Sequence, residues 1–255
     1  MWLKFLGTGT SHGVPVPGCR CQTCTSDDPR NQRMRCSVFL KVKNKKILID
    51  TSPELRLQLI KHRVGIPDII LFTHGHADHI MGFDDIRSFN WRNDRAIDCF
   101  SNSETRQRLQ EAFSYIFLDS SSGNTGGGLP EANLYNISAL PSDWQNIITP
   151  LQIKHGPTEV LGYRIGELAY LTDLNSIPEE TWPELKNLQV LILGALRWRE
   201  HSTHYNIDQA VAVAEKIAAK TTYFTHLSHD VEHVEASSYL PENIKLAFDG
   251  LKIKL

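Results

Sequence analysis

The chain has 255 residues, of which 41% are hydrophobic and 22% carry a charge. This length and composition are typical of a globular protein and are enough for a single large domain over residues 1–255. The formal net charge of -2 argues against nucleic acid as the main partner. We see no export signal and no apolar run of the roughly 18–20 residues that a membrane span needs, so we expect a cytoplasmic protein that does not bind a membrane.

Apolar runs bounded by turn residues predict strands that alternate with helices. The predicted strands span 2–6, 37–42, 46–50, 68–72, 96–101, 147–154, 160–165, 168–172, 189–193 and 222–225, and the predicted helices span 53–63, 80–86, 104–113 and 207–219. Two further short strands are expected on either side of a turn at Asp249-Gly250. This order, with hairpins among the strands, predicts an α/β fold with mixed β-sheets.

Three cysteines lie close together near the N-terminus, at Cys19, Cys21 and Cys24, in a loop rich in proline and glycine at about residues 15–36. In a chain without an export signal, such a cluster indicates a metal site rather than disulfides. Three thiolates suit a tetrahedral zinc that lacks one ligand, and the fourth ligand could be Cys36 or a distant histidine. Three free buried thiols are the alternative, but the loop has few apolar residues to bury them.

A carboxylate, Asp50, ends the apolar strand predicted at 46–50. A carboxylate in this position is unusual, because charged residues are rarely buried. Asp50 could cap the helix that Ser52-Pro53-Glu54 predicts. It could also orient a histidine that binds a metal, and the two roles are compatible.

The stretch Thr73-His74-Gly75-His76-Ala77-Asp78-His79 is the strongest chemical signal in the chain. It places three imidazoles and one carboxylate directly after a predicted strand. His74 and His76 are two positions apart, so they point the same way in an extended chain, whereas Asp78 and His79 enter a helical turn. One loop can therefore hold two metal ions, and a solvated polar loop is a much poorer explanation.

The same kind of residue follows several later strands. His155 ends a strand before Gly-Pro, Asp173 follows the strand predicted at 168–172, and His226 follows the strand predicted at 222–225. Because α/β folds place their chemistry at the carboxyl ends of strands, we expect these residues to share one site with Asp50 and His74.

The remaining polar segments give weaker signals. The loop at 119–130 has no periodicity, so we expect either a lid or a flexible surface loop. We expect His12 at the mouth of the site, His62 at a helix C-terminus, His233 on the surface, and Cys36 and Cys99 in the core.

These motifs occur in the order in which the metallo-β-lactamase superfamily has them, and the chain resembles that superfamily over nearly its whole length. The resemblance implies a four-layer αββα sandwich of two mixed β-sheets, with a dinuclear metal site at one edge. It implies that one ion is held by His74, His76 and His155, that the other is held by Asp78, His79 and His226, and that Asp173 bridges both. A bridging aspartate is typical of the hydrolase and phosphodiesterase branches rather than of β-lactamases.

Within that superfamily, the chain looks most like the PhnP-type phosphodiesterases, which open phosphoribosyl 1,2-cyclic phosphate. The likeness is carried by Gly7-Thr-Gly-Thr10 with Val14-Pro15 and the three cysteines, by Thr225-His226-Leu-Ser-His229, and by His204 before Tyr205-Asn206-Ile207-Asp208. It implies that His229 completes a structural zinc site with the cysteines and that His204 lies near the substrate phosphate. The intervening loops depart from the family, so the leaving group and the sugar stay open.

These features predict a dinuclear metal-dependent hydrolase, and a phosphodiesterase acting on a small cyclic phosphate fits them best. Two divalent ions about 3.5–4 Å apart would share a hydroxide that attacks phosphorus in line. Asp78 is predicted to be a catalytic residue as well as a metal ligand. His204 is the candidate for the general acid or for a side chain that binds the phosphate, and His201 is the alternative candidate for that role. Such ligands accept zinc, manganese or iron, so the expected cofactors are two of these ions and one structural zinc.

The expected partner is a small phosphodiester, and the sequence is compatible with a homodimer. One alternative is a tRNA 3′-processing nuclease of the same superfamily. The Gly-rich arm that grips tRNA is not evident, however, and the net charge is unfavourable for it. Another alternative is a non-catalytic or cofactor-biosynthesis protein that kept the fold, and the complete ligand set argues against it.

Overall fold

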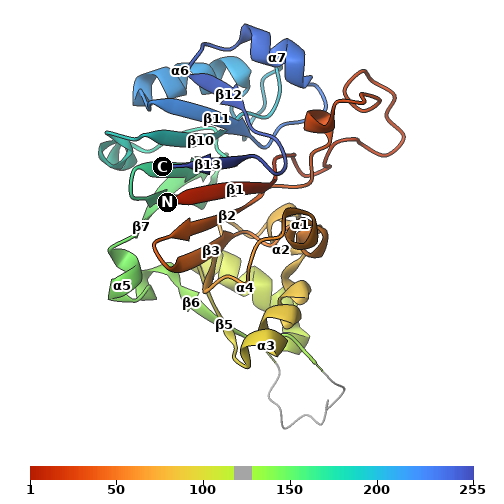
Figure 1. The fold of residues 1–255 in the computed structure, drawn as a ribbon. Helices are drawn as coiled ribbons and strands as arrows, with labels where there is room; N and C mark the ends of the chain where they lie inside the picture. Colours follow the sequence, from red (N-terminus) through yellow and green to blue (C-terminus); the bar gives the residue numbers. More distant parts are fainter. Residues whose placement is uncertain (118–127) are drawn as a thin grey trace.

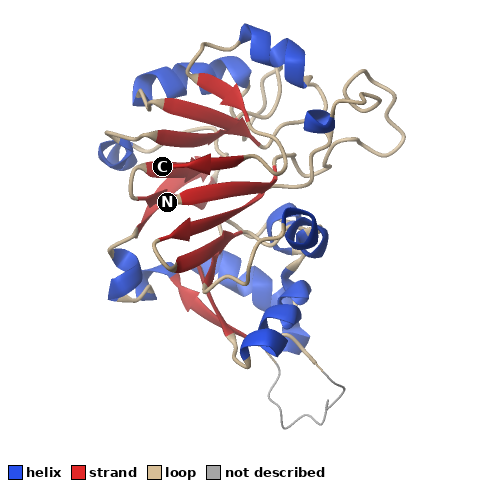
Figure 2. Cartoon of the chain, viewed as in Figure 1, coloured by secondary structure: helices blue, strands red, loops and turns tan. Residues whose placement is uncertain are grey.

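Two β-sheets form the centre of the molecule in the computed structural model, which describes residues 1–117 and 128–255 (Figure 2). The strands of the first sheet are β1 (Trp2–Gly7), β2 (Ser37–Val42), β3 (Lys45–Ile49), β4 (Ile69–Leu71), β5 (Ile97–Ser101), β6 (Ala132–Asn136) and β13 (Lys252–Lys254). Those of the second are β7 (Ile148–His155), β8 (Thr158–Ile165), β9 (Leu168–Leu171), β10 (Val190–Gly194), β11 (Thr221–Thr225) and β12 (Ile244–Leu246). Both sheets contain parallel and antiparallel pairs.

The strand order brings distant parts of the chain together. It is β13-β1-β2-β3-β4-β5-β6 in the first sheet and β12-β11-β10-β9-β8-β7 in the second. The terminal strands β1 and β13 pair antiparallel, with Leu3 opposite Ile253, so the two ends of the chain lie side by side (Figure 1). Strands β3 and β4 run parallel, as do β9, β10 and β11, so the carboxyl ends of neighbouring strands meet at one edge of each sheet.

Helices cover the outer face of each sheet. They are α1 (Leu55–His62), α2 (Ala77–Ile80), α3 (Arg87–Asn93) and α4 (Ser103–Ala112) on the first sheet, and α6 (Ile207–Ile217) and α7 (His233–Tyr239) on the second, with α5 (Ser142–Gln145) before β7. Helix α6 begins with a capping box, in which the Asn206 side chain accepts from Gln209 N and the Gln209 side chain accepts from Asn206 N. That helix ends at Ala218, which adopts the left-handed conformation.

Side chains alternate between separate apolar cores, as the period of two in a β-strand requires. In β3, Ile47 packs between the sheets, whereas Leu48 packs against the helices of the first sheet. In β10, Ile192 packs between the sheets and Leu191 packs under the helices of the second. Three cores therefore separate four layers, and the predicted α/β sandwich of two mixed sheets is confirmed.

Several elements differ from the sequence-based expectations. The helix predicted at 80–86 is split, because α2 ends at Ile80 and a 3₁₀ turn, η2 (Phe83–Ile86), follows. The strands on either side of Asp249-Gly250 do not form a hairpin, since β12 belongs to the second sheet and β13 to the first. Strand β6 and the helices α3, α5 and α7 were not predicted. The expectation of a lid at 119–130 falls almost wholly outside the described residues.

In the described part of the chain, no helix has both the length and the apolar composition to cross a membrane.

Candidate metal centre

Seven histidine and aspartate side chains from both sheets converge at one edge of the sandwich. They form two groups, His74, His76, His155 and Asp173, and Asp78, His79, Asp173 and His226, whose potential ligand atoms lie within 4.8 Å of one another in each group. Asp173 belongs to both groups. These are the seven metal ligands that the sequence analysis predicts. The fold brings them together and places Asp173 between the two groups.

The ends of the strands supply this geometry. Asp50 and His226 follow β3 and β11 directly, and Asp173 is the second residue after β9. All three adopt positive φ angles, of 63° at Asp50, 60° at His226 and 53° at Asp173. Non-glycine residues rarely adopt this conformation, and its cost is accepted mainly where function requires a particular side-chain direction. The left-handed turn diverts each side chain from the line of its strand into the space at the sheet edge.

The spacing of the ligand atoms fits bound metal ions. The His226 Nε2 lies 3.1 Å from Asp173 Oδ1, and the His79 Nε2 lies 3.4 Å from an oxygen of both Asp78 and Asp173. A tetrahedral ion with nitrogen and oxygen ligands at 2.0–2.2 Å would separate them by about 3.4 Å. The Nε2 atoms of His74 and His79 are buried and have no hydrogen-bond partner among the residues that the structure describes. Buried polar atoms are almost always satisfied, so these nitrogens fit the role of metal ligands.

Hydrogen bonds from a second layer of residues fix the imidazoles. Asp50 Oδ2 lies 2.7 Å from His79 Nδ1, and the same carboxylate accepts from the Thr73 backbone N–H and hydroxyl, each at 2.8 Å. The carbonyl of Thr203 lies 2.9 Å from His155 Nδ1. Each bond leaves Nε2 directed at the cluster. Asp50 does not cap α1, whose N-cap is Glu54, so only the second of its two predicted roles has a matching contact.

The pKa shifts of the clustered side chains are those expected of a site that binds cations. Burial lowers the pKa of His79, but the carboxylates of Asp173, Asp78 and Asp50 outweigh it and raise that pKa well above its ordinary value. Burial raises the pKa of Asp173, yet the neighbouring His226 and His79 hold it well below its ordinary value. Three carboxylates thus concentrate negative potential where positive charge would sit.

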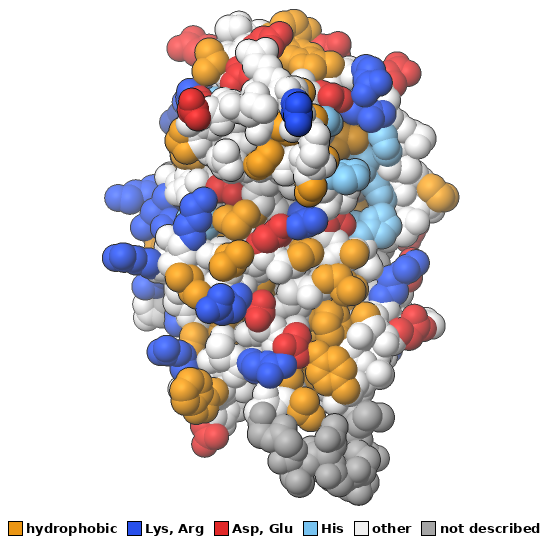
Figure 3. All heavy atoms as spheres, turned by 90° about the vertical axis from the view of Figure 1, so that its right-hand side faces the viewer, with side chains coloured by type: hydrophobic (Ala, Val, Ile, Leu, Met, Phe, Trp, Pro, Cys, Tyr) orange, Lys and Arg blue, Asp and Glu red, His pale blue; other side chains and the backbone are white. Residues whose placement is uncertain are grey.

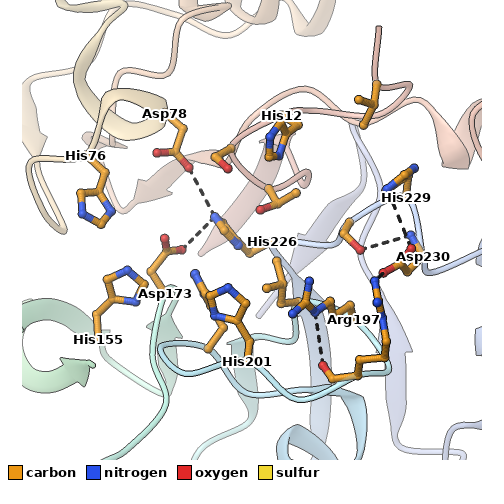
Figure 4. A pocket seen from close by; sticks show the side chains of 17 residues that line it. His12, His76, Asp78, His155, Asp173, Arg197, His201, His226, His229 and Asp230 are labelled. Carbon is orange, nitrogen blue, oxygen red and sulfur yellow. Dashed lines mark hydrogen bonds and ion pairs between the residues drawn. The ribbon is translucent and has the colours of Figure 1, made fainter. Parts of the chain in front are cut away.

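A pocket of about 430 Å³ opens onto the cluster. Its inner wall includes His76, Asp78, His155, Asp173 and His226 (Figure 4). Space-filling atoms show histidine side chains gathered on this face of the molecule (Figure 3). The volume is suited to a small molecule.

His204 lies in the same pocket, on the side of the second sheet. Its ring centroid is 4.6 Å from that of His155 and 5.0 Å from those of His201 and His226. Burial, together with the nearby histidines, lowers the pKa of His204 to about 3 against the opposing effect of Asp173. His12 lines the outer part of the pocket, in line with its expected place at the mouth.

The three N-terminal cysteines and His229 form a separate cluster. The sulfurs of Cys19, Cys21 and Cys24 lie 3.3, 3.5 and 3.6 Å from His229 Nδ1. A tetrahedral zinc with one nitrogen and three sulfur ligands would separate these atoms by about 3.6 Å. The sequence analysis left either Cys36 or a distant histidine as the fourth ligand. In the structure His229 lies beside the three cysteines, whereas Cys36 is buried near Thr225.

A buried arginine that the sequence did not single out ties the two clusters together. Arg33 is 1% exposed and donates to the carbonyls of Ser228 at 2.9 Å and Val231 at 2.8 Å. These residues flank His229 and lie just beyond His226. Nothing in the sequence distinguishes Arg33 from its charged neighbours Arg30 and Arg35, and its partners are almost 200 positions away. His233, expected on the surface, is instead 5% exposed because the start of α7 packs against Phe248.

The comparison with protein families identifies the chain. The sequence profile of the beta-lactamase superfamily domain matches residues 45–227, which include the whole histidine and aspartate cluster. The chain belongs to the beta-lactamase superfamily. The predicted resemblance to the metallo-β-lactamase superfamily is thereby confirmed.

Two relatives match nearly the whole chain. A crystal structure described as a new diphosphatase from the PhnP family is 40% identical, covers 100% of this chain and 97% of its own, and superposes with a TM-score of 0.90. The predicted likeness to PhnP-type proteins is confirmed by this match. The second relative is named octanoyltransferase, from Porphyromonas gingivalis strain W83, and is 35% identical over 97% of this chain. The chain spans about half the length of that relative, 50%.

More distant structures share the fold alone. Zinc-bound PqqB from Methylobacterium extorquens is 16% identical, covers 100% of both chains and has a TM-score of 0.77. The short form of human tRNase Z is also 16% identical, covers 100% of this chain and 99% of its own, and has a TM-score of 0.70. The fold, the PhnP-family match and the histidine and aspartate cluster together support a metal-dependent hydrolase.

Proposed function

We propose that the chain is a dinuclear metal-dependent phosphodiesterase that acts on a small cyclic phosphate. The observation that carries the proposal is the pair of ligand groups that share Asp173 and face a pocket of about 430 Å³. Two such ions, when bound, would supply an activated water and would neutralise charge on the phosphate oxygens. Zinc and manganese both suit ligands of this kind.

The chain's own residues then have distinct roles. His74, His76 and His155 hold one position, Asp78, His79 and His226 hold the other, and Asp173 joins the two. Asp50 and the Thr203 carbonyl keep two of the imidazoles in the orientation that ligation needs. The Thr172 hydroxyl donates to Asp173 Oδ1 at 2.7 Å and leaves the other oxygen facing His74 and His79.

His204 is the residue that we assign to the substrate itself. It lies beside His155 and His226 without belonging to either ligand group. From there its neutral ring can donate a hydrogen bond to the phosphate. It can give a proton to the leaving oxygen once the charge of a bound phosphate has raised its pKa from about 3. His201, its neighbour at 5.0 Å, is the rival for the same role.

The cysteine cluster has no place in this chemistry. Cys19, Cys21, Cys24 and His229 complete a tetrahedral set that would hold one structural zinc and leave no position for substrate. The expected chemistry is therefore confined to the histidine and aspartate cluster.

Hydrolysis of a diphosphate is the second candidate, because the 40% identical PhnP-family relative is named a diphosphatase. The octanoyltransferase name favours no third candidate. Nucleophilic acyl transfer commonly uses cysteine, serine or lysine, and a serine nucleophile needs a base beside it. In the described part of the chain no cysteine or lysine lines the pocket, and neither of its two serines, Ser11 and Ser228, hydrogen-bonds to a histidine. We assign the transferase activity of that relative to the half that this chain does not match.

A substrate panel tests the proposal. Purified protein loaded with zinc or manganese is assayed on bis-p-nitrophenyl phosphate, cyclic nucleotides, cyclic ribose phosphates and nucleoside diphosphate esters. We expect turnover of a cyclic ribose phosphate or a related small diester, with none in the Asp173→Ala variant. Turnover of diphosphates alone would select the second candidate, and failure of the loaded protein on every substrate would contradict both.

A further inference from the structure

Two buried residues join the sheets immediately before the first metal ligand. Phe72 and Thr73 lie between β4 and His74, and both are 0% exposed. Their backbone N–H groups bond within the first sheet. Phe72 N donates to the Phe100 carbonyl of β5 at 2.9 Å, and Thr73 N donates to Asp50 Oδ1 at 2.8 Å. Their carbonyls accept from the second sheet instead.

Strand β8 of the second sheet supplies both of these donors. The hydroxyl of Tyr163 donates to the Phe72 carbonyl at 2.6 Å, and the backbone N–H of Leu161 donates to the Thr73 carbonyl at 2.9 Å. Leu161 can reach across because β9 pairs with β8 only from Tyr163 to Ile165. All four backbone polar groups of the dipeptide are therefore satisfied, two of them by each sheet.

The strand that supplies the donors is also the strand that connects the ligands of the second sheet. β8 pairs with β7, whose last residue is His155, and with β9, which Asp173 follows as the second residue. On the other side of the link, the Thr73 hydroxyl lies 3.0 Å from His74 Nδ1. The Nε2 of His74 in turn lies 3.5 Å from Asp173 Oδ2. The Tyr163 bond thus joins His74 to the strands that carry its partners in the ligand group.

The other ligand group has its own attachment to the first sheet. The backbone N–H of Thr51 donates to the His79 carbonyl at 2.8 Å, and the Thr51 hydroxyl donates to the Ile80 carbonyl at 3.2 Å. These bonds fix helix α2, which also contains Asp78, from within the first sheet. His74 instead directly follows the dipeptide that β8 holds, so a change at β8 should affect the two groups unequally.

We propose that Tyr163 is a positioning residue, which sets His74 against the ligands of the second sheet and thereby determines the affinity for one of the two ions. The assignment rests on the dinuclear centre of the proposed function. A hydrogen bond fixes distance and direction more closely than apolar contacts do. Without the hydroxyl, the Phe72 carbonyl would be buried without its donor, and the segment before His74 would move to satisfy it.

A second buried tyrosine supplies the matched control. Tyr163 and Tyr170 lie opposite each other in β8 and β9, both are 0% exposed, and both belong to the apolar core between the sheets. The Tyr170 hydroxyl has no hydrogen-bond partner in the part of the chain that the structure describes. Tyr163→Phe and Tyr170→Phe therefore remove the same atom from the same core, but only Tyr163→Phe removes a bond to the segment before His74.

Stepwise removal of the metal tests the assignment. The cobalt(II)-loaded protein is titrated with a chelator, and the visible absorption follows each ion of the histidine and aspartate cluster. Thiolate bands in the near ultraviolet report the cysteine cluster separately. We expect Tyr163→Phe to bind one of the two ions about 10- to 100-fold more weakly, with a changed visible spectrum, and to bind the other with nearly the wild-type affinity. Tyr170→Phe should bind both ions as the wild type does.

The comparison of the two ions keeps the outcome independent of folding yield and of turnover. Both affinities are measured on one preparation, so misfolded chain does not change their ratio. Equal weakening of both ions, the same change in Tyr170→Phe, or unchanged affinities in Tyr163→Phe would overturn the positioning role and leave the proposed activity standing. A selective loss in Tyr163→Phe would support the role even if no diester were hydrolysed. A wild-type protein that binds fewer than two ions in the cluster would overturn both proposals.

Discussion

The two ligand clusters of this chain differ in what supports them. The histidine and aspartate cluster is attached to the ends of strands from both sheets and to the short helix α2 that follows β4, and all its members except His76 are buried. The cluster of Cys19, Cys21, Cys24 and His229 is attached to loops, and three of its four members are partly exposed. A site on strand ends can keep an open coordination position without collapsing, because the sheets hold its ligands apart. A site on loops needs the ion itself as its support.

The largest effect is expected at the residue shared by the two ligand groups. Asp173→Ala should lower kcat at least about 10⁴-fold, because the second ion loses its bridge. The fold should persist, since the three apolar cores do not include Asp173. Circular dichroism, metal analysis and kcat are measured together. Asp230→Ala removes another pocket carboxylate and is the matched control. Two retained ions with wild-type kcat would remove Asp173 from the bridging role.

His204→Ala should lower kcat by about 10²–10⁴-fold on substrates with poor leaving groups. The effect should be much smaller for p-nitrophenolate, which departs without a proton. An equal loss on both substrates would indicate that His204 holds the phosphate rather than protonating the leaving group. His201→Ala is the control, and a larger effect there than at His204 would exchange the two assignments.

The ligand residues could be predicted from the sequence because most of them stand in an unusual local context. A histidine or aspartate that follows an apolar strand is unusual by itself, and several of them indicate a common edge. The fold class followed from the alternation of strands and helices. Both the ligand residues and the fold class depend on local sequence patterns, which can be read without the tertiary structure.

The contacts that hold the site together were not predictable in the same way. Arg33 reaches carbonyls almost 200 positions further along the chain, and the Thr203 carbonyl that fixes the His155 ring lies 48 positions beyond it. The Asp249-Gly250 turn resembles a hairpin locally, but the strands on its two sides pair with different neighbours. Such features depend on tertiary packing, which local patterns do not contain.

Asp50 tests how strongly the sheet edge holds its ligands. Asp50→Asn should lower metal affinity or activity about 10- to 100-fold, because the carboxylate that fixes the His79 ring is lost while its shape is kept. Asp249 is the control, a partly buried carboxylate that accepts from Thr8 and Met34 and belongs to neither ligand group. Metal titration is the measurement. Equal losses of metal affinity in Asp50→Asn and Asp249→Asn would show a general effect of buried charge.

The smallest effect on chemistry, and the clearest one on stability, is expected at the cysteines. Cys21→Ser should lower the bound zinc by one equivalent and lower Tm by roughly 5 °C or more. Burial raises the pKa of Cys21, but hydrogen bonds from Cys24 and its neighbours lower it to about 7, so the thiolate needed for zinc is readily formed. Activity should fall only a few-fold, through disorder of the wall that carries His226.

Arg33 explains why that fall should be limited. It holds the Ser228 and Val231 carbonyls from within the core, and the Leu227 backbone pairs with Thr8 and Thr10. The segment after His226 therefore keeps several contacts when the zinc is gone. The double variant with Arg33→Gln should lose far more activity than Cys21→Ser alone. Zinc content decides the matter: a Cys21→Ser protein that keeps the wild-type number of zinc ions, or a disulfide between any two of the three cysteines, would contradict the structural site.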